Sequence, residues 1–154
     1  MATLLATAQA LFDAVASFDK NRLAEILDPT YEHTFAPSSE EFGPPVDRDA
    51  FIGRFAGIEP VLTGLALKPI QSWPNEQART ITVHATGKPS FRDAVRDDGD
   101  AEGEWDFTGE YMFVFTMNES GEKIIKTFEF VEGKVATRMK AQIGKAFARI
   151  SSGS

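Results

Sequence analysis

The hydrophobic positions of this chain follow a helical period in the first part and a strand period in the second. Apolar residues near the N-terminus recur every three to four positions, which predicts an amphipathic helix over residues 3–17. Asp19 is a suitable N-cap for a second, short helix that ends at Pro29. Asp47 is a suitable N-cap for a third helix that ends at Pro60. The first part of the chain is therefore expected to be helical.

From residue 65 onward, apolar and polar residues alternate instead. This period of two predicts strands over residues 65–73 and 79–86, and a long hairpin over residues 109–131 with a polar turn at 118–121. Between them, residues 87–104 are glycine-rich and charged, which indicates a mobile loop long enough to be a lid. A last helix is predicted over residues 135–150, and residues 151–154 look like a tail.

The order of these elements defines the expected fold class. Helices come first, a run of antiparallel strands follows, and no linker divides residues 1–150, so we predict one α+β domain. A curved antiparallel sheet packed against N-terminal helices encloses a cone, in which a pocket forms easily.

Composition narrows the classes of function. The net charge of −7 argues against nucleic acid and anionic membranes as partners. The absence of cysteine excludes disulfides, Cys-based zinc sites and thiol catalysis. No secretory signal or apolar run of roughly 20 residues is visible, so a cytoplasmic protein without a membrane span is expected. The 13 phenylalanines indicate an aromatic interior or cavity.

Three polar groups stand out in the otherwise apolar hairpin: Glu110, Tyr111 and Glu129. Glu129 lies between Phe128 and Phe130, and a carboxylate in a dry pocket is a usable general acid or base. A three-residue turn would place Tyr111 opposite Glu129, whereas a four-residue turn would place Glu110 there.

Gly121 favours the shorter turn, since three-residue loops often end with a left-handed residue. In that register Glu110 and Lys126 share the other face of the hairpin and could form an ion pair. The pocket face would then carry one acid, one phenol and a wall of further side chains, namely Phe113, Phe115, Ile125 and Thr127.

Short sequence patterns connect this chain to a known group of proteins. They are His33-x-x-x-Pro37-Ser38, the pair Glu110-Tyr111, and Gly121-x-Lys123-Ile124 running into Glu129-Phe130-Val131. In this order they resemble the SnoaL-like branch of the NTF2-like superfamily, and within it small fungal natural-product isomerases and semipinacolases. The resemblance implies a cone-shaped pocket, a homodimer, and chemistry without a metal or organic cofactor.

The resemblance also assigns roles to residues. It makes Glu129, Tyr111 and His33 the candidate catalytic residues. Trp105 and Phe107 stand where relatives often carry a tyrosine, which indicates a flatter, more aromatic substrate. The candidate substrate-binding residues are His84, Trp73, Trp105, Phe107, Phe113 and Phe55. Two histidines at unrelated spacing make no recognisable metal motif, although a His-His-carboxylate site stays open.

These observations predict a cofactor-independent isomerase or cyclase, or a dehydratase, acting on a hydrophobic, oxygenated secondary metabolite. Fold alone does not fix the reaction. The alternatives are a non-catalytic module that binds a ligand or another protein, and a hydrolase of the same fold.

Overall fold

A computed structural model describes residues 3–152 of the chain. In this range the helices are α1 (Leu4–Ala16), α2 (Lys20–Ile26), α3 (Arg48–Gly57) and α4 (Gly133–Ser152), with short 3₁₀ turns η1 (Ser38–Glu40) and η2 (Asp93–Val95). The strands are β1 (Leu27–Ala36), β2 (Val46–Asp47), β3 (Leu62–Asn75), β4 (Thr80–Phe91), β5 (Gly109–Met117) and β6 (Ile124–Val131). The predicted tail is partly helical, since α4 continues to Ser152, and its residues 153–154 lie outside the described range.

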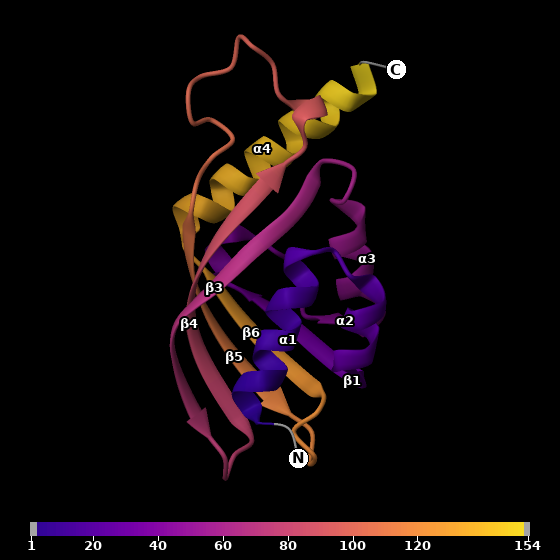
Figure 1. The fold of residues 1–154 in the computed structure, drawn as a ribbon, viewed down its shortest axis with the longest axis vertical. Helices are drawn as coiled ribbons and strands as arrows, with labels where there is room; N and C mark the ends of the chain where they lie inside the picture. The colour runs from indigo at the N-terminus through magenta and orange to yellow at the C-terminus, as the bar shows by residue number, and fades with distance from the viewer. Residues whose placement is uncertain (1–2, 153–154) are drawn as a thin grey trace.

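The strands form one curved sheet in the order β2-β1-β6-β5-β4-β3. Figure 1 shows α1, α2 and α3 together on one side of this sheet, with α4 crossing the end of the strands. This arrangement confirms the predicted α+β cone. One pairing differs from the prediction, because β1 runs parallel to β6 while the other neighbours are antiparallel.

Local capping chemistry explains where the N-terminal helices begin. The side chain of Thr3 accepts a hydrogen bond from the backbone N–H of Ala6, and Asp19 and Asp47 cap α2 and α3 in the same way. Both predicted aspartate caps are therefore confirmed. The second helix ends at Ile26 rather than at Pro29, which lies within β1.

The hairpin of β5 and β6 has a register that neither predicted turn gives. Phe113 pairs with Glu129, and Tyr111 pairs with Val131, so the prediction that Tyr111 faces Glu129 directly is wrong. The turn is longer because the Asn118 side chain accepts hydrogen bonds from the N–H of Lys123 and the hydroxyl of Ser120. Pairing therefore starts only at Met117 and Ile124, with a bulge next to it.

The faces of the hairpin follow from this register. Tyr111, Phe113 and Phe115 point to the helix side as predicted, and their rings stack in a row with centroids 5.8 and 5.4 Å apart. Ile125 does not join them, because the bulge places Ile124 in the core instead. The expected Glu110–Lys126 pair is also absent among the described residues: Glu110 contacts His84 and Lys126 contacts Glu32.

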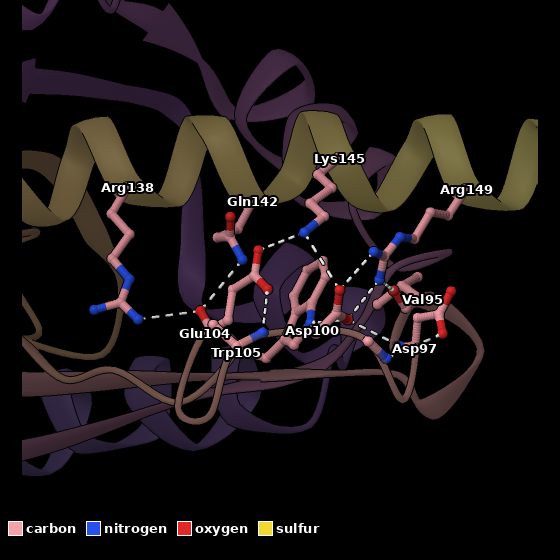
Figure 2. Close-up of polar contacts among 11 residues, drawn as sticks. Val95, Asp97, Asp100, Glu104, Trp105, Arg138, Gln142, Lys145 and Arg149 are labelled. Atoms are coloured by element: carbon pink, nitrogen blue, oxygen red, sulfur yellow. Dashed lines mark hydrogen bonds and ion pairs between the residues drawn. The ribbon is translucent and has the colours of Figure 1, made fainter.

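The segment after β4 is attached to α4 rather than free. β4 extends to Phe91, so the predicted loop starts later than residue 87. Asp100 then contacts Arg149 at 2.6 Å and Lys145 at 3.4 Å, and accepts a hydrogen bond of 2.8 Å from Trp105 Nε1 (Figure 2). Arg138 on α4 also donates to the backbone carbonyls of Gly103 and Glu104. The acidic segment and the basic face of α4 thus pair within the chain.

This clamp shifts the acidity of Asp100. The hydrogen bond from Arg149 holds the pKa of the Asp100 carboxyl far below its usual range, and the bonds from Trp105 and the backbone act in the same direction against desolvation. The Asp100 side chain is only 9% exposed. Asp100 therefore stays ionised well into the acidic range and holds α4 against the end of the sheet.

Candidate active site

A cavity of about 390 Å³ lies between the inner face of the sheet and the helices. The sheet contributes Tyr111, Phe113, Glu129 and Val131, while α1, α3 and α4 close the other sides. Its walls are largely apolar. Arg54 from α3 and Lys140 from α4 add two cations to the lining. Such a shape, mostly apolar with a few polar groups, is typical of a site for a small hydrophobic molecule.

The central polar feature of the cavity is a histidine–carboxylate pair. His33 Nε2 on β1 and Glu129 Oε1 on β6 are 3.1 Å apart. The parallel register places His33 beside Thr127, two residues before Glu129, so the two side chains share the inner face. His33 is 1% exposed and the Glu129 side chain 18%. Within the described residues, no Lys or Arg pairs with Glu129, and no hydrogen bond engages its second oxygen, Oε2.

Aromatic groups fix the His33 ring. It stacks on Phe51 of α3 with centroids 4.4 Å apart and an interplanar angle of 12°, and Phe35 lies 4.2 Å away. Its second nitrogen, Nδ1, is 2.6 Å from the hydroxyl of Tyr31. Both ring nitrogens therefore have polar partners, as a buried histidine requires.

Tyr111 supplies a phenol to the same cavity. Burial raises the pKa of this phenol above its ordinary value, and the nearby carboxylates of Glu129 and Glu132 raise it further. Its hydroxyl has no hydrogen-bond partner among residues 3–152, which leaves it able to donate to a bound molecule. Gly87 on β4 makes room for the ring, since a Cβ there would lie 2.5 Å from a Tyr111 ring carbon.

His84 and Trp73 are predicted to bind substrate but lie on the opposite face of the sheet. The face that carries Ile81, Val83 and Ala85 turns to the core, so His84 points outward, where it contacts Glu110 at 2.9 Å. Trp73 on β3 is 46% exposed and borders the same outer hollow as His84. Neither residue lines the cavity. A role for His84 in the site required its face of the strand to turn inward, and that face turns outward.

Trp105 and Phe107 are also absent from the cavity lining. They pack against Phe91 beyond the end of the cavity, and α4 covers them with Arg138 over Phe107 and Lys145 and Arg149 over Trp105. Their expected role in stacking on substrate therefore has no support in the geometry. Of the predicted substrate-binding residues, Phe55 and Phe113 do line the cavity.

Several residues of the site were not predicted. Tyr31, Phe35 and Phe51 surround His33, and Met139 and Lys140 of α4 complete the wall. The pattern Tyr31-x-His33-x-Phe35 alternates along one strand and could have placed all three side chains on one face. No local pattern could have shown that α4 returns to close the cavity.

Residues 3–152 contain neither a metal-binding cluster nor a membrane-spanning helix. No cluster of three or more His, Asp or Glu side chains in that range is arranged to hold a metal ion. None of the described helices combines the length and apolar character that crossing a membrane requires.

The sheet and the helices that cover it form an α+β cone with the NTF2-like fold. No protein-family model matches the sequence, and no curated protein matches it either. Solved structures do match. An NTF2-like protein of unknown function from Burkholderia pseudomallei is 14% identical with a TM-score of 0.66, over 93% of this chain and 98% of that one.

Two fungal proteins are also similar in structure. AusH from Aspergillus nidulans is 21% identical with a TM-score of 0.69, over 84% of this chain and 83% of that one. The BvnE pinacolase from Penicillium brevicompactum is 17% identical with a TM-score of 0.75, over 93% and 95%. At these identities the likeness establishes the fold, which confirms the resemblance expected from the sequence, and leaves the reaction open.

Proposed function

We propose that this protein is an isomerase or cyclase that rearranges a hydrophobic, oxygenated secondary metabolite by acid–base catalysis without a cofactor. One observation carries the proposal. Glu129 faces an apolar cavity, one of its oxygens is held by His33, and no hydrogen bond within residues 3–152 engages the other. A carboxylate held in this way is positioned to take or give a proton.

The chemistry follows from the placement of three side chains. Glu129 removes a proton from a C–H or O–H group of the substrate, and the electron pair moves into the substrate. The same proton returns to another substrate atom as the product forms, so no oxidant or reductant is needed. Tyr111 donates a hydrogen bond to the substrate oxygen on which charge develops, because its raised pKa keeps the phenol protonated.

Three features support this reading over that of a passive carrier. The cavity holds about 390 Å³ of free space rather than being filled by phenylalanine side chains. Glu129 is not neutralised by Lys or Arg among the described residues. BvnE, which is described as a pinacolase, has a similar fold, and this supports an enzymatic function.

The proposal can be tested with simple ketones before the natural substrate is known. The protein is incubated in D₂O with a panel of polycyclic ketones, including a β,γ-unsaturated ketone whose conversion to the conjugated enone is followed by absorbance. We expect deuterium uptake or conversion that the Glu129→Gln variant loses. Ketones that bind but undergo no Glu129-dependent exchange or conversion would favour the carrier function instead.

We also propose that the protein forms a homodimer, as the resemblance implies. The outer face of the sheet carries large exposed apolar side chains, namely Trp73, Met112, Phe128 and Phe130, which are 36–46% exposed. Exposed apolar groups gathered on one face are typical of a contact surface. Light scattering at micromolar concentration should give twice the chain mass of 16.9 kDa, and a monomeric mass would contradict the proposal.

A further inference from the structure

Tyr31 is a buried phenol that neither the predicted site nor the proposed chemistry includes. It lies on β1 two residues before His33, is 2% exposed, and packs edge-on against Phe51. Its hydroxyl is 2.6 Å from His33 Nδ1, which is the shorter of the two hydrogen bonds that the imidazole makes. In a buried contact this short, one of the two atoms must donate a hydrogen and the other must accept it.

The surroundings indicate which atom donates. Burial raises the pKa of Tyr31 far above its ordinary value, with a smaller contribution from Glu129, so the phenol keeps its hydrogen. No hydrogen bond joins the neighbouring Thr127 hydroxyl to a described residue, so it does not take the phenol hydrogen. The acceptor that remains for this hydrogen is His33 Nδ1.

The geometry points to Tyr31 as a positioning residue that fixes the tautomer of His33. Its hydroxyl donates to Nδ1, so the hydrogen of the neutral imidazole resides on Nε2 and is donated to Glu129 Oε1. The opposite tautomer would place a lone pair of Nε2 against the carboxylate, which is repulsive while Glu129 is ionised. Tyr31, His33 and Glu129 thus form a chain of hydrogen bonds in which Tyr31 donates to His33 and His33 donates to Glu129.

The catalytic role of this hydrogen-bond chain rests on the proposed function. Because the Nε2 hydrogen is donated to Oε1, that oxygen is occupied, and Oε2 is the oxygen of Glu129 that exchanges the proton with the substrate. Tyr31 therefore sets which oxygen of Glu129 serves the substrate, without touching the substrate itself.

The tautomer can be read by ¹⁵N NMR without any substrate, so this test is independent of the proposed function. Protonated and bare imidazole nitrogens differ widely in ¹⁵N shift, and the chain has only two histidines. His84→Gln removes the outer one and assigns the signals of His33. The measurement is made at neutral pH on the wild-type protein, on Glu129→Gln, and on the double variant Tyr31→Phe/Glu129→Gln.

We expect a bare Nδ1 and a protonated Nε2 in the wild-type protein and in Glu129→Gln, where the carboxylate no longer influences the imidazole. In the double variant, both nitrogens should move toward averaged shifts. A protonated Nδ1 in the wild-type protein would overturn the inference, and this result needs no variant to fold. Loss of the tautomer in Glu129→Gln alone, or its persistence in the double variant, would show that Tyr31 does not set it.

Discussion

The sheet carries the same pair of side chains on its two faces, a histidine beside a glutamate, in opposite surroundings. On the inner face, His33 and Glu129 are 3.1 Å apart with side chains 1% and 18% exposed. On the outer face, His84 and Glu110 are 2.9 Å apart with side chains 29% and 67% exposed. The distances are almost equal, so contact alone does not make a site.

The difference lies in what surrounds each pair. The inner imidazole is held by Tyr31 and Phe51, and the carboxylate beside it faces a cavity with largely apolar walls. The outer pair is open to solvent, where an ion pair contributes about 0–1 kcal/mol. The outer pair is therefore a natural internal control for every experiment on the inner one.

The largest contrast is expected from neutralising each carboxylate. Glu129→Gln should reduce turnover of a reactive ketone at least about a hundredfold, as expected for a lost general base. Glu110→Gln changes the same chemical group on the outer face and should leave turnover unchanged. Initial rates of the two variants, measured side by side, test whether turnover requires the Glu129 carboxylate. Equal rates in both would remove Glu129 from the mechanism.

A smaller effect on activity is expected from the phenol beside the inner pair. Tyr111→Phe removes one neutral hydrogen-bond donor, which corresponds to about 1.4 kcal/mol or roughly tenfold in kcat. Met112→Leu, the next residue along β5 and directed to the outer face, is the matched control. If both variants keep full kcat, Tyr111 has only a packing role.

Replacing the histidine of the inner pair should reduce the unfolding free energy more than replacing the histidine of the outer pair. His33→Asn leaves the buried Tyr31 hydroxyl and the Glu129 carboxylate without their partner, which should cost about 1–3 kcal/mol of unfolding free energy. His84→Asn breaks only an exposed contact and should cost less than about 1 kcal/mol. Urea unfolding at neutral pH gives both values. A cost for His84→Asn as large as that for His33→Asn would contradict the contrast.

The pH dependence of the unfolding free energy tests how α4, which forms one wall of the cavity, is anchored. Asp100 anchors α4, and the pKa of Asp100 is lowered in the folded state. Its stabilising effect is therefore fully present above the unfolded pKa of about 4 and is lost as the pH falls toward the folded value.

Asp100→Asn should accordingly be less stable than the wild-type protein at neutral pH, and the gap should narrow near about pH 3. Asp98→Asn removes a carboxylate that is exposed in the same segment and should behave like the wild-type protein. Urea midpoints at the two pH values measure the gap. A gap of constant size would mean that the Asp100 charge is not what holds α4.

The sequence predicts the parts of this structure that depend on neighbouring residues. Asp19 and Asp47 cap helices because a cap needs only the next turn of the chain. The alternation in β5 places Tyr111 and Phe113 on one face for the same reason. The orientation of His84 could also have been predicted. Ile81 and Val83 lie on the other face of its strand, and the more apolar face of a strand turns to the core.

Other parts depend on contacts that no local pattern contains. The hairpin register depends on the Asn118 side chain. It accepts a hydrogen bond from the N–H of Lys123, which lengthens the turn and shifts the register of the two strands. The pairing of β1 with β6 depends on which strand edges remain free, and the clamp at Asp100 depends on where α4 ends. The sequence could therefore indicate Glu129 and His33 as candidates but not that they meet.

The position of β6 between β1 and β5 also determines when the site can form. His33 and Glu129 are 96 positions apart in the chain, and β6 is what joins the β2-β1 edge to the rest of the sheet. During synthesis, every nascent chain that lacks residues 124–131 has its sheet in two unconnected parts. Pairs so distant in sequence slow folding, because a long loop must close before the contact forms. The site must therefore assemble late, after nearly the whole chain has been made.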